Sequence, residues 1–201
     1  MRGILIGIDE AGRAPLAGPV SVGLVAVPEG FDVQREFKGV KDSKQLTPER
    51  REEIYEQLIE RKRNGDVSFK VVMTSHTYID ECGITRAVKD AIVRGLNVLK
   101  PDPDATVIML DGLLSAPSQF LQRTVIGGDD IVPVVSLASV AAKVERDRLM
   151  RRMAKKYPGF GFESHKGYGT RKHWSAIQTL GLCEIHRRTY CKVDWTLPLK
   201  V

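Results

Sequence analysis

Cysteine is scarce in this 201-residue sequence, which contains only Cys82, Cys183 and Cys191. Three cysteines are too few for a disulfide framework, their odd number leaves one unpaired, and their spacing is not that of a metal site. Long apolar runs are lacking too, because no stretch approaches the roughly 18 to 20 apolar residues of a membrane span. The N-terminus passes from Met1-Arg2-Gly3 directly into a strand pattern, without the features of a signal peptide. We therefore expect a cytoplasmic protein with reduced thiols and no membrane partner.

Repeats, low-complexity segments and Gly/Ser-rich linkers are also missing, which predicts one sizeable domain or a domain with a small helical appendage. The 42% of hydrophobic and 28% of charged residues argue against disorder. Apolar, β-branched runs predict strands over residues 4–8, 20–27, 67–73, 106–110 and 124–126. Helical patterns cover residues 48–63 (after Thr47 as N-cap), 85–99, 133–156 and 171–180. This order favours an α/β or α+β fold with one core, whose first two strands form an antiparallel pair.

The charge of the chain is unevenly distributed. The formal net charge is +6, and from Lys143 to the C-terminus there are 14 Lys and Arg residues but only 5 Asp and Glu. The part before Lys143 has 17 basic and 20 acidic residues. A basic C-terminal third predicts a polyanionic partner, such as a nucleic acid. From charge alone, a solvated basic surface without a partner is the alternative.

Acidic residues follow three of the predicted strands, in Ile8-Asp9-Glu10, Leu110-Asp111-Gly112 and Gly127-Gly128-Asp129-Asp130. Any one of these acids could simply face solvent. Several carboxylates at one sheet edge would repel one another and raise each other's pKa, so such a cluster normally requires a cation. Oxygen ligands without Cys or His favour Mg²⁺ or Mn²⁺ over zinc. Because side chains alternate along a strand, we expect the strand to give way to a loop at Glu10, so that Glu10 can reach back towards Asp9.

These stretches together resemble the ribonuclease HII family, the type 2 ribonucleases H. The resemblance implies a ribonuclease H-like α/β fold, with a mixed central sheet flanked by helices and a C-terminal helical extension. It divides the chain into a catalytic domain over residues 1–157 and a substrate-contacting helical region over residues 158–201, packed on the same core. The matching motifs follow the family's order over nearly the whole chain: Gly7-Ile8-Asp9-Glu10-Ala11-Gly12-Arg13, Asp42-Ser43-Lys44, Leu110-Asp111-Gly112, Gly128-Asp129, Ser139-Val140-Ala141-Ala142-Lys143-Val144, Arg146-Asp147 and His165-Lys166-Gly167-Tyr168-Gly169-Thr170.

The resemblance implies a metal-dependent endoribonuclease. Its substrates would be the RNA strand of RNA–DNA hybrids and single ribonucleotides embedded in duplex DNA, cut on their 5′ side, as in ribonucleotide excision repair. Hydrolysis with two Mg²⁺ or Mn²⁺ ions would leave 5′-phosphate and 3′-hydroxyl ends. By position, the four acids that hold the metals and carry catalysis would be Asp9, Glu10, Asp111 and Asp129. We choose Asp129 over Asp130 because it directly follows Gly128.

The resemblance also assigns the substrate contacts. The family's Gly-Arg-Gly loop, here Gly12-Arg13-Ala14, and the tyrosine Tyr168 would read the 2′-hydroxyl that distinguishes RNA from DNA. Contacts to phosphates, which position the strand without reading its sequence, would add to these. The candidates for such contacts, besides Arg13, are Ser43, Lys44, Ser139, Lys143 and Lys166. For any single lysine a solvated surface role is the alternative, and for His165 we prefer a structural hydrogen bond to a proton shuttle.

Two positions depart from the family pattern. Ala14 stands where the family has glycine, and if the backbone there needs a positive φ, alanine costs roughly 1 kcal/mol or more. Ile131 replaces a lysine that is common two residues after the fourth acid. One alternative is therefore an impaired or altered-specificity hybrid-binding variant, and others are a structural RNA-binding protein and a ribonuclease restricted to hybrids. We expect a monomer, and the tail over residues 193–198 shows no clamp-binding pattern.

Overall fold

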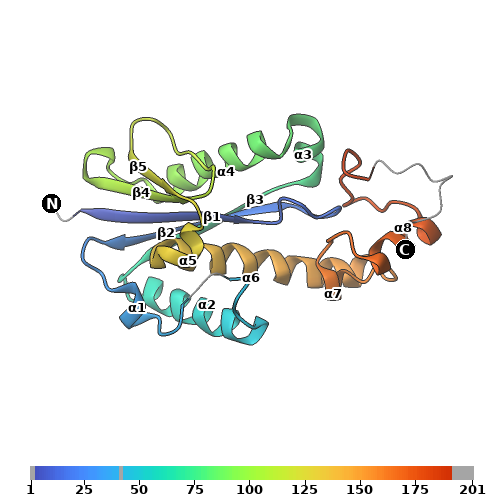
Figure 1. The fold of residues 1–201 in the computed structure, drawn as a ribbon, viewed down its shortest axis with the longest axis horizontal. Coiled ribbons are helices and arrows are strands. Elements are labelled where there is room, and N and C mark those ends of the chain that lie inside the picture. The colour runs from blue at the N-terminus through green and yellow to red at the C-terminus, as the bar shows by residue number, and fades with distance from the viewer. Residues whose placement is uncertain (1–2, 41–42, 192–201) are drawn as a thin grey trace.

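The computed structural model describes residues 3–40 and 43–191. Asp42, which belongs to the Asp-Ser-Lys motif, and the tail over residues 193–198 lie outside the described residues. A sheet lies between two helical layers, and the chain after α6 extends beyond one end of the sheet (Figure 1). The strands are β1 (Ile4–Ala11), β2 (Val20–Pro28), β3 (Ser68–Thr74), β4 (Thr106–Asp111) and β5 (Leu121–Val125). The helices are α1 (Val33–Glu36), α2 (Pro48–Arg63), α3 (His76–Cys82), α4 (Ile84–Leu99), the 3₁₀ helix η1 (Pro103–Ala105), α5 (Gly128–Ile131), α6 (Pro133–Lys156), α7 (Phe162–His165) and α8 (Arg171–Leu180).

The central sheet is mixed and has the order β3-β2-β1-β4-β5. Antiparallel pairing joins β1 to β2 and β2 to β3, whereas β1 pairs parallel with β4 and β4 parallel with β5. The expected antiparallel pair of the first two strands is therefore confirmed, as is the mixed sheet flanked by helices. The parallel strands β1 and β4 end at the same edge of the sheet, which brings the acids that follow them together.

The sheet separates two apolar cores. Helices α3 and α4 cover one face, where Ile6, Ile8 and Leu110 pack among the buried residues. Helices α1, α2 and α6 cover the other face (Figure 1). Helix α6 lies unusually close to the sheet, because a Cβ atom added at Gly7 would be 2.3 Å from the carbonyl oxygen of Val134, and one at Gly23 would be 2.2 Å from that of Ala138. Backbone approach of this kind explains the small residues in the first half of α6.

Most of the predicted elements are present. Helices α2, α6 and α8 have the predicted bounds, and the Thr47 side chain accepts a hydrogen bond from the Arg50 backbone N–H as the N-cap. The largest errors in bounds are at two strands: β1 continues through Glu10 to Ala11, and β5 runs from Leu121 to Val125 instead of over residues 124–126. The bounds of β2, β3, β4 and α4 differ from the predicted ones by one residue at one or both ends. The four short helices α1, α3, α5 and α7 were not predicted.

The chain after α6 packs on a third apolar cluster. Phe162 of α7 and Ile177 of α8 join Met150 of α6 with Leu16 and Ala17 of the β1–β2 loop. The backbone follows the same arrangement, since the N–H of Leu16 donates a 2.8 Å hydrogen bond to the carbonyl of Gly167. The loop that follows Asp9 and Glu10 is thereby held directly against the C-terminal helices.

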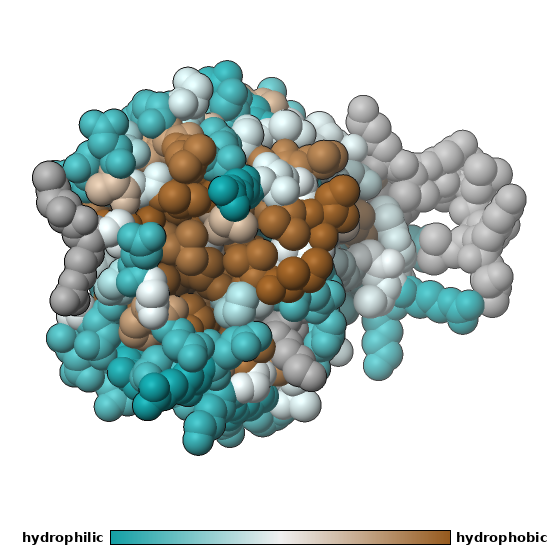
Figure 2. Space-filling model, turned by 60° about the vertical axis from the view of Figure 1, so that its left-hand side comes forward, coloured by the Kyte–Doolittle hydropathy of each residue, from teal (hydrophilic) through white to brown (hydrophobic). Residues whose placement is uncertain are grey.

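An apolar surface is exposed where β1, β4 and the edge strand β5 lie. Figure 2 brings forward the side on which β4 and β5 lie in Figure 1, and hydrophobic residues gather at its centre. A groove there is lined by Ile4, Val107, Met109 and Leu121, and Leu121 is 62% exposed on the edge strand β5. Among the described residues, no helix is long and apolar enough to cross a membrane.

Candidate active site

Asp9 and Asp111 lie next to each other at the end of the parallel strands. Ile8 of β1 pairs with Leu110 of β4 as the last pair of that ladder, so Asp9 and Asp111 occupy the next step on both strands. Neighbouring strands are about 4.8 Å apart, and both side chains fall on the face that α6 covers, by alternation from Ile8 and Leu110. The carboxyl of Asp111 is further fixed, because its Oδ1 accepts a 2.8 Å hydrogen bond from the backbone N–H of Gly128.

Glu10 joins the acids from within the strand, and the prediction that the chain leaves the strand there was wrong. Glu10 pairs with Val22 of β2, which keeps β1 extended through Ala11. On the other side of β1, however, the ladder with β4 has already ended at Ile8. With no neighbouring strand on that side, Glu10 lies close enough to Asp111 for the two carboxylates to interact. Its Oε1 also accepts a 3.2 Å ion-pair contact from Arg13.

The electrostatics of these acids reflect burial and mutual repulsion. The pKa of Asp9 is raised to about 8, mainly by burial. A hydrogen bond from Ser139 opposes the rise, and the charges of Glu10 and Asp111 contribute to it. Burial also raises the pKa of Glu10, against the lowering effect of Arg13, while the charge of Asp111 adds to the rise. Carboxylates in this state gain stability from a bound cation.

Asp129 lies in α5. The first residue of this helix, Gly128, donates the hydrogen bond to the Asp111 carboxylate. The Asp129 side chain is buried, and its Oδ2 accepts a 3.2 Å ion pair from Lys44. The backbone carbonyl of Asp129 accepts a 2.5 Å hydrogen bond from Ser136 of α6, so that α5 and α6 are joined at this point. The neighbouring Asp130 is exposed and contacts Gln45.

The four acids fit a hard divalent cation by donor type, since all their ligand atoms are carboxylate oxygens. Their geometry is open: within residues 3–40 and 43–191, no three side chains among His, Cys, Asp and Glu are grouped closely enough to hold a metal ion. Asp9, Glu10 and Asp111 nevertheless interact electrostatically, and Asp129 is joined to them through α5. The residues therefore suit the cation, and a bound ion would draw the carboxylates together.

Three predicted substrate contacts surround these acids. Ser139 of α6 hydrogen-bonds the Asp9 carboxyl and lies 2.8 Å from the hydroxyl of Ser43, Oγ to Oγ. Ser43 is buried and its carbonyl accepts a 2.6 Å hydrogen bond from Arg51, whereas the Lys44 side chain is 79% exposed. Ser43 and Lys44 thus both lie at these acids, Ser43 facing inward and Lys44 exposed.

Tyr168 and Lys143 form a second group beside α6. The Lys143 ammonium lies 5.9 Å from the Tyr168 ring centroid and 2.8 Å from the Asp147 carboxylate. Tyr168 is 40% exposed, which leaves part of its ring accessible to a ligand. Lys166 turns elsewhere: its ammonium donates to the carbonyls of Glu163 and Ser164, so it caps the end of α7.

Ala14 carries no backbone strain, and the concern raised by its sequence was wrong on this point. Apart from glycines, only Lys100 and Lys166 among the described residues have a positive φ. Ala14 is exposed, and the positive φ in this loop belongs to Gly12, at +93°. The conformational argument for an impaired variant therefore falls away. Ile131 is 67% exposed.

Sequence reasoning missed the two residues that fix this loop. Arg146 and Arg187 are fully buried, and each donates to three backbone carbonyls. In the sequence both count as part of the basic C-terminal third. The Arg146-Asp147 motif includes Arg146, but it assigns no role to this residue. His165 has the structural role that we expected, because its Nε2 lies 2.7 Å from the Phe160 carbonyl.

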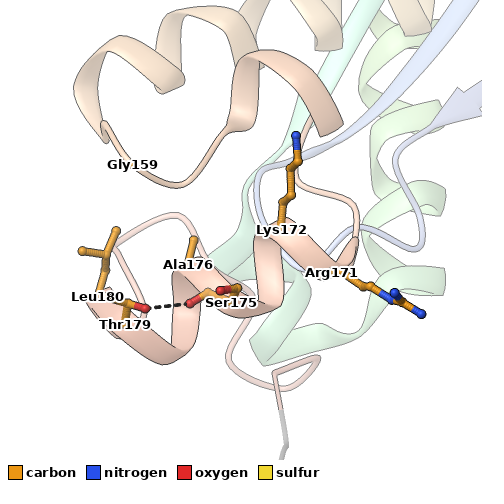
Figure 3. Close-up of a pocket in the computed structure, with 7 residues that line it drawn as sticks. All are labelled: Gly159, Arg171, Lys172, Ser175, Ala176, Thr179 and Leu180. Carbon is orange, nitrogen blue, oxygen red and sulfur yellow. Dashed lines mark hydrogen bonds between the residues drawn. The ribbon is translucent and has the colours of Figure 1, made fainter. Parts of the chain in front are cut away.

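A basic groove lies at α8, away from the acids. It is lined by Arg171, Lys172, Ser175 and Thr179 together with Gly159. Arg171 and Lys172 extend from the first turn of α8 in different directions (Figure 3). Both are exposed, and neither forms an ion pair with any residue that the structure describes. This surface is suited to contacts with phosphates.

The chain is similar to known proteins over most of its length. The family model described as Ribonuclease HII matches residues 6–196. The chain is 40% identical over 188 residues to the ribonuclease HII of Caldicellulosiruptor bescii, covering 94% of this chain and 86% of that protein. It is similar to the crystal structure of the ribonuclease H2 from Pyrococcus horikoshii, with a TM-score of 0.75, 29% identity and coverage of 92% and 93% of the two chains. It is also similar to the ribonuclease HII in a complex with PCNA from Archaeoglobus fulgidus, with a TM-score of 0.75, 25% identity and coverage of 96% and 97%.

Proposed function

The chain belongs to the ribonuclease HII family, and on that premise we propose that it cuts the RNA strand of RNA–DNA hybrids and also cuts 5′ to single ribonucleotides embedded in duplex DNA. As a member of this family it is a metal-dependent endoribonuclease that acts on RNA–DNA hybrids. The observation that carries the finer proposal is the loop of Gly12, Arg13 and Ala14 directly beside Glu10, to which Arg13 is paired. A site that reads one sugar next to the cutting point needs no long RNA stretch.

The metal site in this proposal consists of Asp9, Glu10, Asp111 and Asp129, which would hold two Mg²⁺ or Mn²⁺ ions. Bound there, the ions would supply Lewis-acid activation of water and neutralise charge on the leaving 3′ oxygen. Support comes from the raised pKa values of Asp9 and Glu10, since a buried carboxylate cluster of this kind is stabilised by cations. The products would carry 5′-phosphate and 3′-hydroxyl ends.

The chain's own residues have separate tasks in this scheme. Ser139 orients the Asp9 carboxyl, and Ser43 supports Ser139 from behind. Lys44 is exposed beside Asp129, where its charge can meet a substrate phosphate. Tyr168, beside Lys143, offers a partly exposed ring on which the sugar next to the ribonucleotide can stack. Gly12, Arg13 and Ala14 would contact the ribose itself.

Further parts of the proposal concern the setting of the reaction. We propose a monomer that acts in the cytoplasm, divided into a catalytic part over residues 1–157 and a substrate-contacting part over residues 158–201. The contacts of the second part with Leu16 and Ala17 support a substrate role for it, because these residues belong to the loop that follows Asp9 and Glu10. Lys166 would contribute to substrate binding mainly through the backbone of its loop, because its ammonium already donates to the Glu163 carbonyl.

The test is cleavage of a DNA duplex that holds one ribonucleotide, with Mg²⁺ and with Mn²⁺, beside an all-RNA/DNA hybrid of the same sequence. We expect both substrates to be cut, the first on the 5′ side of the ribonucleotide. Asp129→Asn should abolish cleavage, whereas Asp130→Asn serves as the matched control and should retain it. Cleavage of the hybrid alone would leave a ribonuclease restricted to hybrids, and an active Asp129→Asn with an inactive Asp130→Asn would reassign the fourth acid.

A further inference from the structure

Arg187 is a fully buried cation without a carboxylate partner among the described residues. Its Nε donates a 3.0 Å hydrogen bond to the Gly18 carbonyl, one terminal nitrogen donates at 2.7 Å to the Arg13 carbonyl, and the other at 2.6 Å to the Gly12 carbonyl. The guanidinium also lies 5.1 Å from the ring centroid of Tyr190. Burying an arginine is costly unless its donors are satisfied, so three carbonyls replace the missing counter-ion.

The segment that carries Arg187 is fixed from two directions. The backbone N–H of Arg187 donates a 2.7 Å hydrogen bond to the Leu16 carbonyl. From the other side, the carboxylate of Asp80 in α3 accepts from the backbone N–H groups of Arg188, at 2.8 Å, and Thr189, at 3.1 Å. The backbone around Arg187 is therefore anchored both to the β1–β2 loop and to α3.

This contact determines which way two peptide groups face. In a trans peptide the carbonyl and the next N–H point in opposite directions, and the described residues contain no cis peptide bond. Since the carbonyls of Gly12 and Arg13 point at Arg187, the N–H groups of Arg13 and Ala14 point away from it. Both residues are exposed, and neither N–H donates to any group within the described part of the chain.

We propose that Arg187 is a positioning residue for ribose recognition, which turns the N–H groups of Arg13 and Ala14 towards the substrate as a pair of adjacent donors. Two neighbouring backbone donors on one side of a loop suit an oxygen acceptor. A 2′-hydroxyl provides such an oxygen, and a deoxyribose does not. The inference rests on the proposed function, because it explains how that site distinguishes one ribonucleotide within DNA. It also gives a purpose to a buried cation that never touches the substrate.

The variant Arg187→Lys tests the proposal, since an ammonium cannot hold three carbonyls in the planar geometry of a guanidinium. The measurement is the dissociation constant, in EDTA, for a duplex with one ribonucleotide and for the same duplex in all-DNA form. We expect wild type to prefer the ribonucleotide duplex, and the preference to fall by about fivefold or more in Arg187→Lys. The KM for single-ribonucleotide cleavage should rise in parallel.

Ile177→Ala is the matched control. Ile177 is buried in the same apolar cluster but lies on α8, so its truncation lowers stability without changing the loop of Gly12 to Ala14. A merely structural role for Arg187 predicts that both variants lose folded protein and keep the wild-type preference per folded molecule. That result, or a wild-type preference near one, would overturn the proposal. Loss of wild-type cleavage would instead count against the proposed function.

Hydrogen exchange of the wild-type chain covers the case in which Arg187→Lys does not fold. The amides of Arg13 and Ala14 should exchange rapidly in the free protein, because they are exposed and donate to nothing described. Binding of the ribonucleotide duplex in EDTA should slow both amides more than binding of the all-DNA duplex. Equal protection by the two duplexes, or slow exchange in the free protein, would contradict the proposed orientation.

Discussion

The Nε2 atoms of His173 and His186 lie 3.0 Å apart in the interior of the C-terminal region, so one of them carries the proton and the other accepts it. The Nδ1 of His173 lies 2.9 Å from the Tyr168 carbonyl and must donate to it. Burial lowers the pKa of His173 to about 4, so its Nε2 is an acceptor for His186. His186 Nδ1 is then free to accept the 2.9 Å hydrogen bond from the backbone N–H of Cys183. A directed chain of imidazoles thus ends on the backbone of Tyr168.

This chain predicts a loss of stability in acid. His173 has a pKa of about 6.5 when unfolded and about 4 when folded, so the unfolded state binds more protons in that window and stability falls as pH drops from about 6.5 to about 4. His173→Phe should lower stability at pH 7 by roughly 1 to 3 kcal/mol, because it leaves the His186 N–H unpaired. Urea unfolding should show this difference shrinking by about 1 to 2 kcal/mol at pH 5. A difference that stays constant with pH would contradict the neutral chain.

Asp9 predicts the opposite pH dependence in the metal-free protein. Its pKa is about 8 when folded and 3.8 when unfolded, so the folded state binds more protons between these values and loses stability as pH rises through them. Asp9→Asn removes the titration and should stabilise the metal-free protein by more than about 2 kcal/mol at pH 9. Near pH 4 the two proteins should be equally stable. Thermal unfolding in EDTA across this range is the measurement.

The same substitution should abolish cleavage. Residues that merely support a metal ligand typically contribute about 10- to 100-fold to activity, so removal of a ligand should lower metal-dependent cleavage by at least about a hundredfold. If Asp9→Asn is more stable than wild type at high pH but inactive, the charge of Asp9 serves cleavage at a cost in stability. Activity close to wild type would remove Asp9 from the proposed metal site.

Local signals in the sequence predict most of the fold, because they act over a few residues. Thr47 followed by Pro48 sets the start of α2, and the apolar runs identify β1, β2 and β4. The end of β1 was mistaken because pairing with β2 continues after pairing with β4 stops, which no local pattern records. Helix α3 is only seven residues long, too short for a periodic pattern to mark it.

The site divides in the same way. The acids could be found because they follow predicted apolar strands, and the resemblance indicated which four of them belong to the site. The role of Arg187 could not be found, since its partners Gly12 and Arg13 are 175 and 174 positions away. In the sequence a buried arginine is indistinguishable from one on a basic surface. Two of the positive charges counted in the basic C-terminal third, Arg146 and Arg187, are buried and hold the β1–β2 loop.

Gly12 should be far less tolerant of substitution than a loop glycine with a similar backbone. A Cβ atom at Gly12 would meet the Nε of Arg146 at 2.1 Å, in addition to the strain of its φ of +93°. Gly30, with a φ of +81° and nothing within 4 Å, isolates the backbone cost. Gly30→Ala should cost about 1 to 2 kcal/mol, and Gly12→Ala at least about 2 kcal/mol more, because displaced Arg146 loses its carbonyl partners. Equal costs in urea unfolding would refute the close contact.

Ala14→Gly should be nearly silent. Because Ala14 is exposed and has no positive φ, glycine relieves no strain there and instead adds freedom to the unfolded chain. We expect a destabilisation of about 0.4 to 1 kcal/mol and a change in single-ribonucleotide kcat/KM below about twofold. A clear rise in kcat/KM would show that the alanine methyl crowds the substrate sugar, and it would restore position 14 as a determinant of specificity.

The salt dependence of duplex binding should report the basic surface of α8. The slope of log K against log salt concentration is negative, and each lost phosphate contact reduces its magnitude by about one. Arg171 and Lys172 are exposed and have no ion pair with a described residue. The double variant Arg171→Gln/Lys172→Gln should therefore reduce the magnitude of the slope by about two. Arg148→Gln is the matched control, because Glu52 and Glu56 already neutralise Arg148. If the slope becomes shallower for Arg148→Gln and not for the double variant, the duplex lies along α6 instead of α8.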